Sequence, residues 1–458
     1  MPFIPHTGDD VRIMLDTLGI ERVAQLFGEI PTGLCVTHLA GIPDALSEQQ
    51  IGRLMHERAE QDRGMLSFIG AGAYEHHIPA AVWEITTRGE FYSAYTPYQA
   101  EASQGTLQLI YEYQSMLTAL TAMDISNASL YDGASALAEA ALMALRLKRK
   151  DTTRRVLIPH ALNPRYKSVL RTLCTNQGVE FHELAHDAAS GRLSERALAS
   201  APPAAALVVA QPNFFGVIED VDRLERYARE RDLLLIGCVN PTSLALLKPP
   251  GQWGETGADI VCGEGQPLGV PLSSGGPYFG FMTCRKAHVR QLPGRLVGRT
   301  VDARGRTGFT LTLQAREQHI RRSKATSNIC TNQGLTATAA TIYMALLGPH
   351  GLRQVAAASH ACTRELTTRL AALKLQPRFD APFFHEVAID LGQSAAPVLD
   401  RLFEKTDIVG GYDLARADER LADCVLICAT ETKTAADLDR YTAALDAALA
   451  DKRLAAEI

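Results

Sequence analysis

The middle of the chain alternates short apolar runs with stretches of helical periodicity, and this alternation constrains the fold more than any other feature. The apolar runs cover residues 156–159, 206–212, 233–238 and 258–262. Helical stretches begin near Arg165 and Asp222, between these runs. Strands without polar alternation are buried on both faces, which happens when helices cover both sides of a parallel sheet. We therefore predict an α/β fold with a large, mainly parallel sheet.

The composition permits large cores and excludes several classes of partner. The chain has 458 residues, of which 46% are hydrophobic, and its net charge is −5 without any block of lysine and arginine. Neither nucleic acid nor a membrane surface is therefore expected as a partner. Nine cysteines form no CxxC pair, which favours reduced thiols over disulfides or a zinc site. With no signal-like N-terminus and no membrane-length apolar run, we expect a cytoplasmic protein.

Three segments are expected along the chain. Residues 1–64 form a helical arm, residues 65–334 the large sheet domain, and residues 335–458 a long helix followed by a small α/β domain. The long helix is expected to end near Gly348, and strand-like runs at 385–391 and in the apolar stretch after Asp423 mark the small domain.

The arm has clear helix-start signals. Thr7 or Asp9 is expected to cap a first helix through Leu18, and a capping box beginning at Ser47 starts a second helix that ends near Glu60. Arms of this kind often wrap a partner subunit.

Residues 257–282 read as strand, loop and strand, with a glycine-rich turn before the second strand. The pattern resembles the segment on which fold-type I enzymes, the aminotransferase-like group that uses pyridoxal 5'-phosphate, carry the lysine that binds the cofactor. With Pro271 and the run 273–277 laid on their counterparts, Gln266 takes the place of that lysine. An amide cannot form an imine. The resemblance therefore implies a fold-type I chain that does not bind the cofactor covalently.

A second contact with the cofactor is also missing by the same comparison. In the catalytic relatives, the strand corresponding to 233–238 ends in an aspartate that pairs with the ring nitrogen of the cofactor. This chain has Val239 and Asn240 there. The alternative imine lysine is Lys324, but it lies among charged neighbours, without the apolar strand that would lower its pKa. A self-sufficient, aminotransferase-like pyridoxal enzyme is therefore the less favoured interpretation.

Two further segments have the composition of binding sites. A helix that begins at Gly133, Ala134 and Ser135 could hold an anion, because free N–H groups and the helix dipole meet there. In pyridoxal enzymes this element holds the cofactor phosphate, so the segment is interpreted either as a vestigial phosphate loop or as a simple helix cap. No metal site is expected, since the adjacent His76 and His77 do not share a helix face.

A tyrosine-rich loop precedes the helix that begins near Ser103. Its residues are Tyr95, Thr96, Pro97, Tyr98 and Gln99. Tyrosine offers a ring face and a hydroxyl, so the loop suits a pocket wall, although packing is favoured on the residues alone.

Several long strings together resemble one family, the glycine cleavage system P-protein, and within it the alpha subunit of the split forms. They are YTPYQAEASQG, SNASLYDGASALAEA, PNFFGVIED, GADIVCGEGQPLGVPLSSGGPYFGF, LPGRLVGRT and KATSNICTNQGL. The strings are spread over almost the whole chain, and several are long enough to be specific.

The resemblance implies a function shared between two chains. In split P-proteins the beta subunit carries the lysine-bound pyridoxal 5'-phosphate, and alpha is a homologous partner without it. An α2β2 complex would decarboxylate glycine and pass the aminomethyl group to the lipoyl arm of the H-protein. Because the pocket of fold-type I dimers lies at the subunit interface, residues Tyr95 to Gln99 are expected to line it. A non-catalytic scaffold subunit stays open as an alternative.

Overall fold

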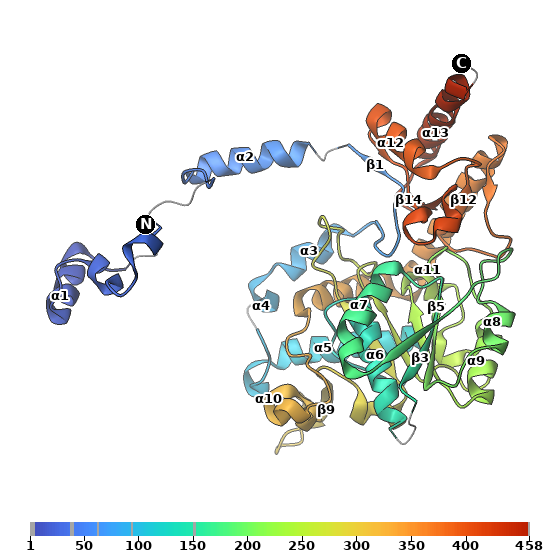
Figure 1. The fold of residues 1–458 in the computed structure, drawn as a ribbon. Helices are drawn as coiled ribbons and strands as arrows, with labels where there is room; N and C mark the ends of the chain where they lie inside the picture. The colour runs from blue at the N-terminus through green and yellow to red at the C-terminus, as the bar shows by residue number, and fades with distance from the viewer. Residues whose placement is uncertain (1–4, 37–40, 62–63, 93–94, 150–152, 457–458) are drawn as a thin grey trace. The chain divides into compact units, whose positions relative to one another are not determined.

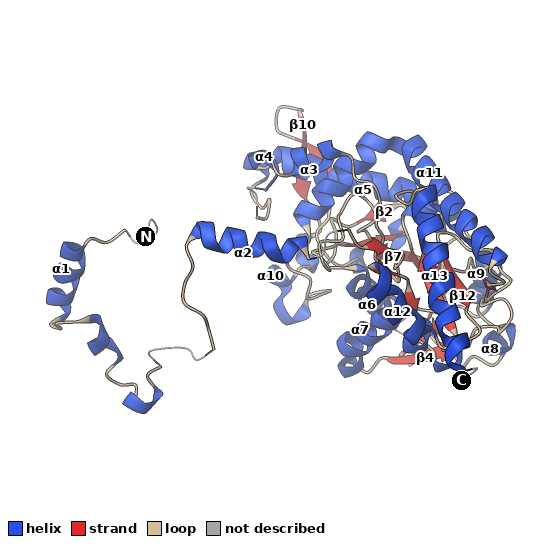
Figure 2. Ribbon diagram, turned by 90° about the horizontal axis from the view of Figure 1, so that it is seen from above, coloured by secondary structure: helices blue, strands red, loops and turns tan. Residues whose placement is uncertain are grey.

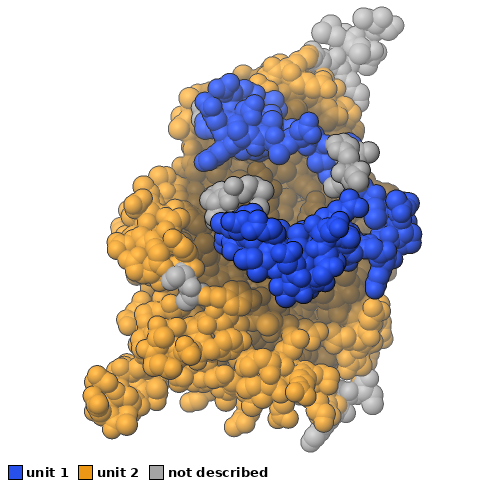
Figure 3. Space-filling model, turned by 90° about the vertical axis from the view of Figure 1, so that its left-hand side faces the viewer, with its two compact units in different colours: residues 1–64 blue, residues 65–458 orange. Residues whose placement is uncertain are grey.

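The computed structural model describes residues 5–36, 41–61, 64–92, 95–149 and 153–456. The chain divides into two compact units, residues 1–64 and 65–458, which Figure 3 colours separately.

The first unit contains two helices, α1 (Gly8–Leu18) and α2 (Glu48–Glu60). The side chains of Thr7 and Ser47 accept a backbone N–H from the first turn of each helix, as the capping signals predicted. None of the residues described in this unit is buried.

The second unit is built on a seven-stranded sheet with strand order β2-β8-β7-β6-β5-β3-β4. Figures 1 and 2 show this unit from two directions. The strands of the sheet are β2 (Ile125–Ser126), β3 (Arg155–Pro159), β4 (Glu180–Leu184), β5 (Ala206–Gln211), β6 (Leu234–Val239), β7 (Ile260–Glu264) and β8 (Gly280–Cys284). Strands β3 to β7 are parallel to one another, whereas β8 is antiparallel to β7 and β2 to β8. The predicted mainly parallel sheet is confirmed.

Helices cover both faces of this sheet. Side chains alternate along each strand, so that Leu157 and Leu207 face one core while Val156 and Ala206 face the other. The first core is completed by α3 (Ala80–Thr86), α5 (Gln104–Thr121), α8 (Glu195–Ala199), α9 (Val221–Glu230) and the start of α11 (Gly334–Ala372). The second is completed by α6 (Gly133–Leu147) and α7 (Pro164–Cys174).

The long α11 changes direction at Gly348, where φ is 58°. Before this kink, Ala337 and Tyr343 pack in the core of the large sheet. After it, Leu366 and Leu370 pack in a separate core. A left-handed residue followed by Pro349 interrupts the helical hydrogen bonds, which explains the kink.

The separate core belongs to a four-stranded antiparallel sheet, β11-β12-β15-β14. Its strands are β11 (Gln376–Pro377), β12 (Glu386–Asp390), β14 (Tyr412–Asp413) and β15 (Cys424–Cys428), packed against α12 (Ala395–Thr406) and α13 (Ala435–Ala456). A parallel pair, β1 (Leu66–Ser67) with β13 (Ile408–Val409), brings the start of the second unit beside it.

The hairpin of β9 (Val297–Val301) and β10 (Thr307–Leu311) was not predicted from the sequence. Arginines interrupt the alternation of apolar and polar residues that would indicate strands. Val297 and Leu311 nevertheless pack with Leu107 of α5 in a small core of their own. Two short helices, α4 (Gly89–Tyr92) and α10 (Gln318–Arg321), complete the unit. Among the residues described, no helix has the length and apolar character that a membrane span requires.

Candidate functional site

The carboxyl ends of β5, β6 and β7 open onto a cavity of about 70 Å³, called here the strand-edge cavity. Its lining includes Tyr74, Tyr166, Asn213, Asn240 and Glu264. Ligands of open α/β sheets bind at this edge, because the strand ends and helix N-termini converge there. This cavity is therefore the place to test for a cofactor.

Gln266 follows β7 and is buried, with 1% of its surface exposed. Its Oε1 accepts the backbone N–H of Tyr74 at 2.8 Å, and its Nε2 donates to the carbonyls of Tyr74 and Val270, each at 2.8 Å. The amide thus uses both ends to hold the chain near Tyr74 against the loop after β7. It has a structural task that an ammonium group could not perform, since a lysine has no acceptor.

The N-terminus of α6 is closed by two carboxylates of the chain itself. Asp132 caps the helix by accepting the N–H of Ser135 at 2.6 Å, and Glu264 accepts the N–H of Gly133 at 2.9 Å. Gly133 is also tightly enclosed, because a Cβ there would collide with the hydroxyl of Tyr166 and the backbone of Glu264. The place predicted for an anion is therefore occupied by side chains from β7 and the helix cap.

Asn240, at the end of β6, also has structural partners. Its Oδ1 accepts the N–H of Thr242 at 2.9 Å, and its Nδ2 lies 3.2 Å from Nε2 of His385. No acid stands at this strand end to pair with a pyridinium nitrogen, because the side chain here is an amide.

The residues at the strand edge do not fit pyridoxal phosphate. Gln266, predicted at the imine position, is an amide engaged in three hydrogen bonds, and the N-terminus of α6, predicted for the phosphate, is closed by Glu264. The strand-edge cavity measures about 70 Å³ and does not reach Gln266, which lines a separate hollow of about 370 Å³ beside Tyr74 and Val270.

Two buried acids flank this region. Burial raises the pKa of Glu264 to about 8, although backbone N–H groups oppose the shift. Burial likewise raises the pKa of Glu386, on β12, to about 7. The Glu386 carboxyl accepts the hydroxyl of Tyr74 and the N–H of Ala71, each at 2.6 Å, and so joins the small sheet to the segment before α3.

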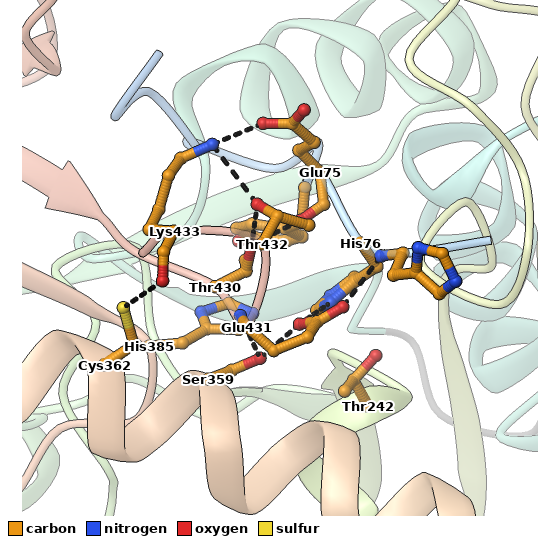
Figure 4. A network of polar contacts seen from close by, with 12 residues as sticks. Glu75, His76, Thr242, Ser359, Cys362, His385, Thr430, Glu431, Thr432 and Lys433 are labelled. Atoms are coloured by element: carbon orange, nitrogen blue, oxygen red, sulfur yellow. Dashed lines mark hydrogen bonds and ion pairs between the residues drawn. The ribbon is translucent and has the colours of Figure 1, made fainter. Parts of the chain in front are cut away.

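A second polar network lies beside this segment, with Glu431 at its centre (Figure 4). One carboxylate oxygen is 2.8 Å from Nδ1 of His76 and accepts the hydroxyl of Ser359, on α11, at 2.8 Å. The other accepts the N–H of His77 at 2.8 Å. The two histidines thus tie their loop to α11 and to the loop after β15.

The tyrosine loop, residues 95–99, has a different setting. Tyr95 is 86% exposed and Tyr98 is 49% exposed, whereas Pro97 is buried. Beneath the loop lies the guanidinium of Arg295, which donates to Oγ1 of Thr96 at 3.2 Å and lies 5.7 Å from the ring centre of Tyr98. The loop therefore offers two exposed phenol rings on top of a buried cation.

Comparison with known proteins identifies the family. The sequence profile of the glycine cleavage system P-protein matches residues 1–445. The chain belongs to the glycine cleavage system P-protein family. It is 63% identical to the probable glycine dehydrogenase (decarboxylating) subunit 1 of Thioalkalivibrio sulfidiphilus, over 98% of this chain and 100% of that protein. With the corresponding protein of Nitrosomonas europaea, the identity is 60% over 98% and 99% of the two chains.

Solved structures agree with this P-protein assignment. A crystal structure of glycine decarboxylase (P-protein) of the glycine cleavage system, in inhibitor-bound form, matches with a TM-score of 0.86 and 38% identity, over 98% of this chain and 100% of that one. The glutamate decarboxylase of Lactobacillus brevis matches with a TM-score of 0.67 at 15% identity, over 93% and 97% of the two chains. The latter likeness shows the fold alone, and the predicted fold-type I architecture is confirmed.

Other polar groups in this P-protein family chain have structural explanations. Lys324 is exposed in a short helix and does not line the strand-edge cavity. His160, His186 and Asp418 place ligand atoms within 4.8 Å of one another. However, the Arg420 guanidinium donates to both oxygens of Asp418, at 2.7 and 2.9 Å, so we assign this cluster to an ion-pair network.

Sequence reasoning missed two groups that define these regions, Glu264 and Glu386, and it did not single out Arg295 from the other arginines of its segment. Glu264 directly precedes the Gly265–Gln266 step, so a search for carboxylates near the replaced lysine could have found it. Neither of the other two had a local signal. Glu386 reaches Tyr74 across more than three hundred residues of chain, and Arg295 was one arginine among many in a basic segment.

Proposed function

We propose that this chain is the alpha subunit of a glycine decarboxylase. With a beta subunit that carries pyridoxal 5'-phosphate, it decarboxylates glycine and transfers the aminomethyl group to the lipoyl arm of an H-protein. The observation that carries the proposal is 63% identity, over full length, to a protein named as subunit 1 of glycine dehydrogenase (decarboxylating). The satisfied amide of Gln266 supports the division of labour, because this chain has no amine at the cofactor position.

In this proposal the cofactor, when bound to beta, supplies the electron sink for loss of carbon dioxide. The alpha chain contributes side chains to the interface pocket. The tyrosine loop is suited to this task, because Tyr95 and Tyr98 expose their rings although large apolar rings are usually covered. We assign these two tyrosines, with Thr96, Pro97 and Gln99, to the wall of the glycine or lipoyl channel.

The N-terminal arm supports the expectation of a partner chain. None of its described residues is buried, and large apolar side chains are exposed, among them Ile13, Leu26 and Phe27. Capped helices without a core of their own are stable only when another surface covers them. We propose that the arm packs on the beta subunit in an α2β2 complex. All nine cysteines are unpaired, which supports a cytoplasmic location.

The test is reconstitution of glycine-dependent exchange of carbon dioxide. Alpha and beta expressed together with lipoylated H-protein should be active, and omission of either chain should abolish exchange. Activity of beta alone would overturn the proposal in favour of a scaffold role for alpha. Activity of alpha alone with pyridoxal phosphate would favour a self-sufficient enzyme.

Replacing Tyr95 and Tyr98 together by alanine should raise the KM for glycine or H-protein roughly tenfold, as expected for loss of a few contacts. If the kinetics of the intact complex stay unchanged, the tyrosine loop does not line the channel.

A further inference from the structure

Arg295 is buried, with 3% of its surface exposed, just before β9. Its Nη1 donates to Oδ1 of Asn332 at 2.9 Å and its Nη2 to Oγ1 of Thr96 at 3.2 Å, while Tyr98 offers a ring face. Its Nε is buried without any acceptor. All these partners are neutral, so the guanidinium charge has no counter-ion among the residues that the structure describes.

This arrangement is unusual in its energetics. Burying a charge that lacks an opposite charge is unfavourable, and buried cations are therefore normally paired. Lys167, also buried, follows this rule, because its Nζ lies 3.0 Å from a carboxylate oxygen of Glu183. Arg295 departs from it, which indicates that an anion from outside this chain completes the site.

The neighbours of Arg295 hold the guanidinium in place without neutralising it. Asn332, which orients one end, is itself fixed by donating to Oγ of Ser129 at 2.7 Å. Thr96 and Tyr98 belong to the tyrosine loop, which lines the interface pocket in the function proposed above. A planar guanidinium with oriented N–H groups is suited to bind a carboxylate or phosphate.

Resting on that proposed function, we propose that Arg295 is the anion-binding residue that this chain lends to the pocket of its partner. The anion is a carboxylate or phosphate group held there, either the carboxylate of glycine or the phosphate of the cofactor. The cation is covered by Tyr98 in the isolated chain, and residues 95–99 have no helix or strand to hold them. Because Arg295 is 3% exposed, binding of the anion requires this loop to shift.

The experiment compares Arg295→Met and Arg295→Lys with the wild-type αβ complex. Arg299→Met is the matched control, because Arg299 lies four residues further along and is exposed. If Arg295 binds the glycine carboxylate, Arg295→Met raises the KM for glycine roughly tenfold to a hundredfold, in line with a lost charged hydrogen bond. Binding of methylamine, which lacks the carboxylate, is then unchanged. The KM of Arg295→Lys for glycine is then between those of the wild-type and Arg295→Met complexes.

If Arg295 instead binds the cofactor phosphate, the affinity of the Arg295→Met complex for pyridoxal phosphate falls roughly tenfold to a hundredfold. Its affinity for pyridoxal, which has no phosphate, is then unchanged. Circular dichroism and the mass of the complex establish that each variant is folded and assembled. Arg295→Lys keeps the charge and so serves if the methionine variant does not fold.

Two results overturn the inference. One is an assembled Arg295→Met or Arg295→Lys complex with wild-type affinity for glycine and cofactor. The other is weakened assembly with normal kinetics per assembled complex, which would place the missing anion on a side chain of the partner. An inactive wild-type complex would instead overturn the proposed function, so the two failures are distinguishable.

Discussion

The strand-edge cavity and the tyrosine loop differ in whether their polar and charged groups find partners within the chain. At the strand edge, Glu264 and Asp132 occupy the helix N-terminus, and Gln266 makes hydrogen bonds at both ends of its amide. At the tyrosine loop, the buried guanidinium of Arg295 has an Nε–H without an acceptor, and the rings of Tyr95 and Tyr98 are exposed to solvent. The first region is closed by the chain itself, and the second is the one for which we propose an anion from another molecule.

This difference shows where function resides in a chain that keeps an enzyme fold. A region whose polar groups are all paired internally has no remaining capacity to bind a ligand strongly. A buried charge without a counter-ion is costly in isolation, and the proposed anion would offset that cost. The strand edge is therefore a structural joint, whereas the loop is the candidate binding surface.

The largest effect is expected at the joint. Gln266→Lys should destabilise the chain by about 3–5 kcal/mol, because it buries an ammonium and leaves the N–H of Tyr74 unpaired. Added pyridoxal phosphate should give no imine band at about 420 nm that borohydride removes. The reason is that Glu264 closes the helix N-terminus predicted for the phosphate. Denaturant unfolding measures the loss of stability, and absorbance before and after borohydride measures the imine band. Gln252→Lys, at an exposed position, is the control. A bleachable band in Gln266→Lys would contradict a closed cavity.

A smaller effect concerns Glu386 and pH. Burial raises the pKa of Glu386 from 4.5 to about 7. Its contribution to stability is thus fully present below pH 4.5 and is lost as pH rises to about 7. Glu386→Gln keeps both contacts, because the amide accepts from Ala71 and donates to Tyr74. The variant should therefore gain about 2–3 kcal/mol relative to wild type between pH 5 and pH 8. Unfolding free energies that differ equally at both pH values would show that Glu386 is already ionised at pH 5.

Gly133 tests how tightly the joint is packed. Gly133→Ala should cost about 1–3 kcal/mol, because the added Cβ meets Tyr166 and Glu264. Gly105→Ala is the matched control near the start of α5, where a Cβ meets nothing within 4 Å, and it should stabilise the helix by about 0.5–1 kcal/mol. Thermal unfolding of both variants makes the comparison. A neutral Gly133→Ala would show that the helix N-terminus has spare room.

The smallest effect on stability is expected at the loop. Tyr95→Ala should change the unfolding free energy of the isolated chain by less than about 0.5 kcal/mol, because the side chain is 86% exposed. The same variant should weaken glycine turnover in the αβ complex. Loss of stability without loss of turnover would reverse the comparison and make the tyrosine loop a structural element.

Several elements followed from local pattern. The capping residues Thr7 and Ser47 set the starts of α1 and α2, and the apolar runs became β3, β5 and β6 with ends within a residue or two of those expected. These features depend on neighbours in sequence, so they can be read from a short window. The β9–β10 hairpin could not, because its apolar side chains are defined by the helix they pack against.

The sequence by itself determined the parallel α/β architecture and the presence of an amide, Gln266, where the family resemblance predicts the cofactor lysine, since periodicity and side-chain identity are local properties. Only the tertiary structure decided that Glu264 caps α6, that Glu386 reaches Tyr74, and that Arg295 is buried without an anion. Burial and the pairing of charges depend on residues far apart in the chain, and their energies are set by the surroundings that folding creates.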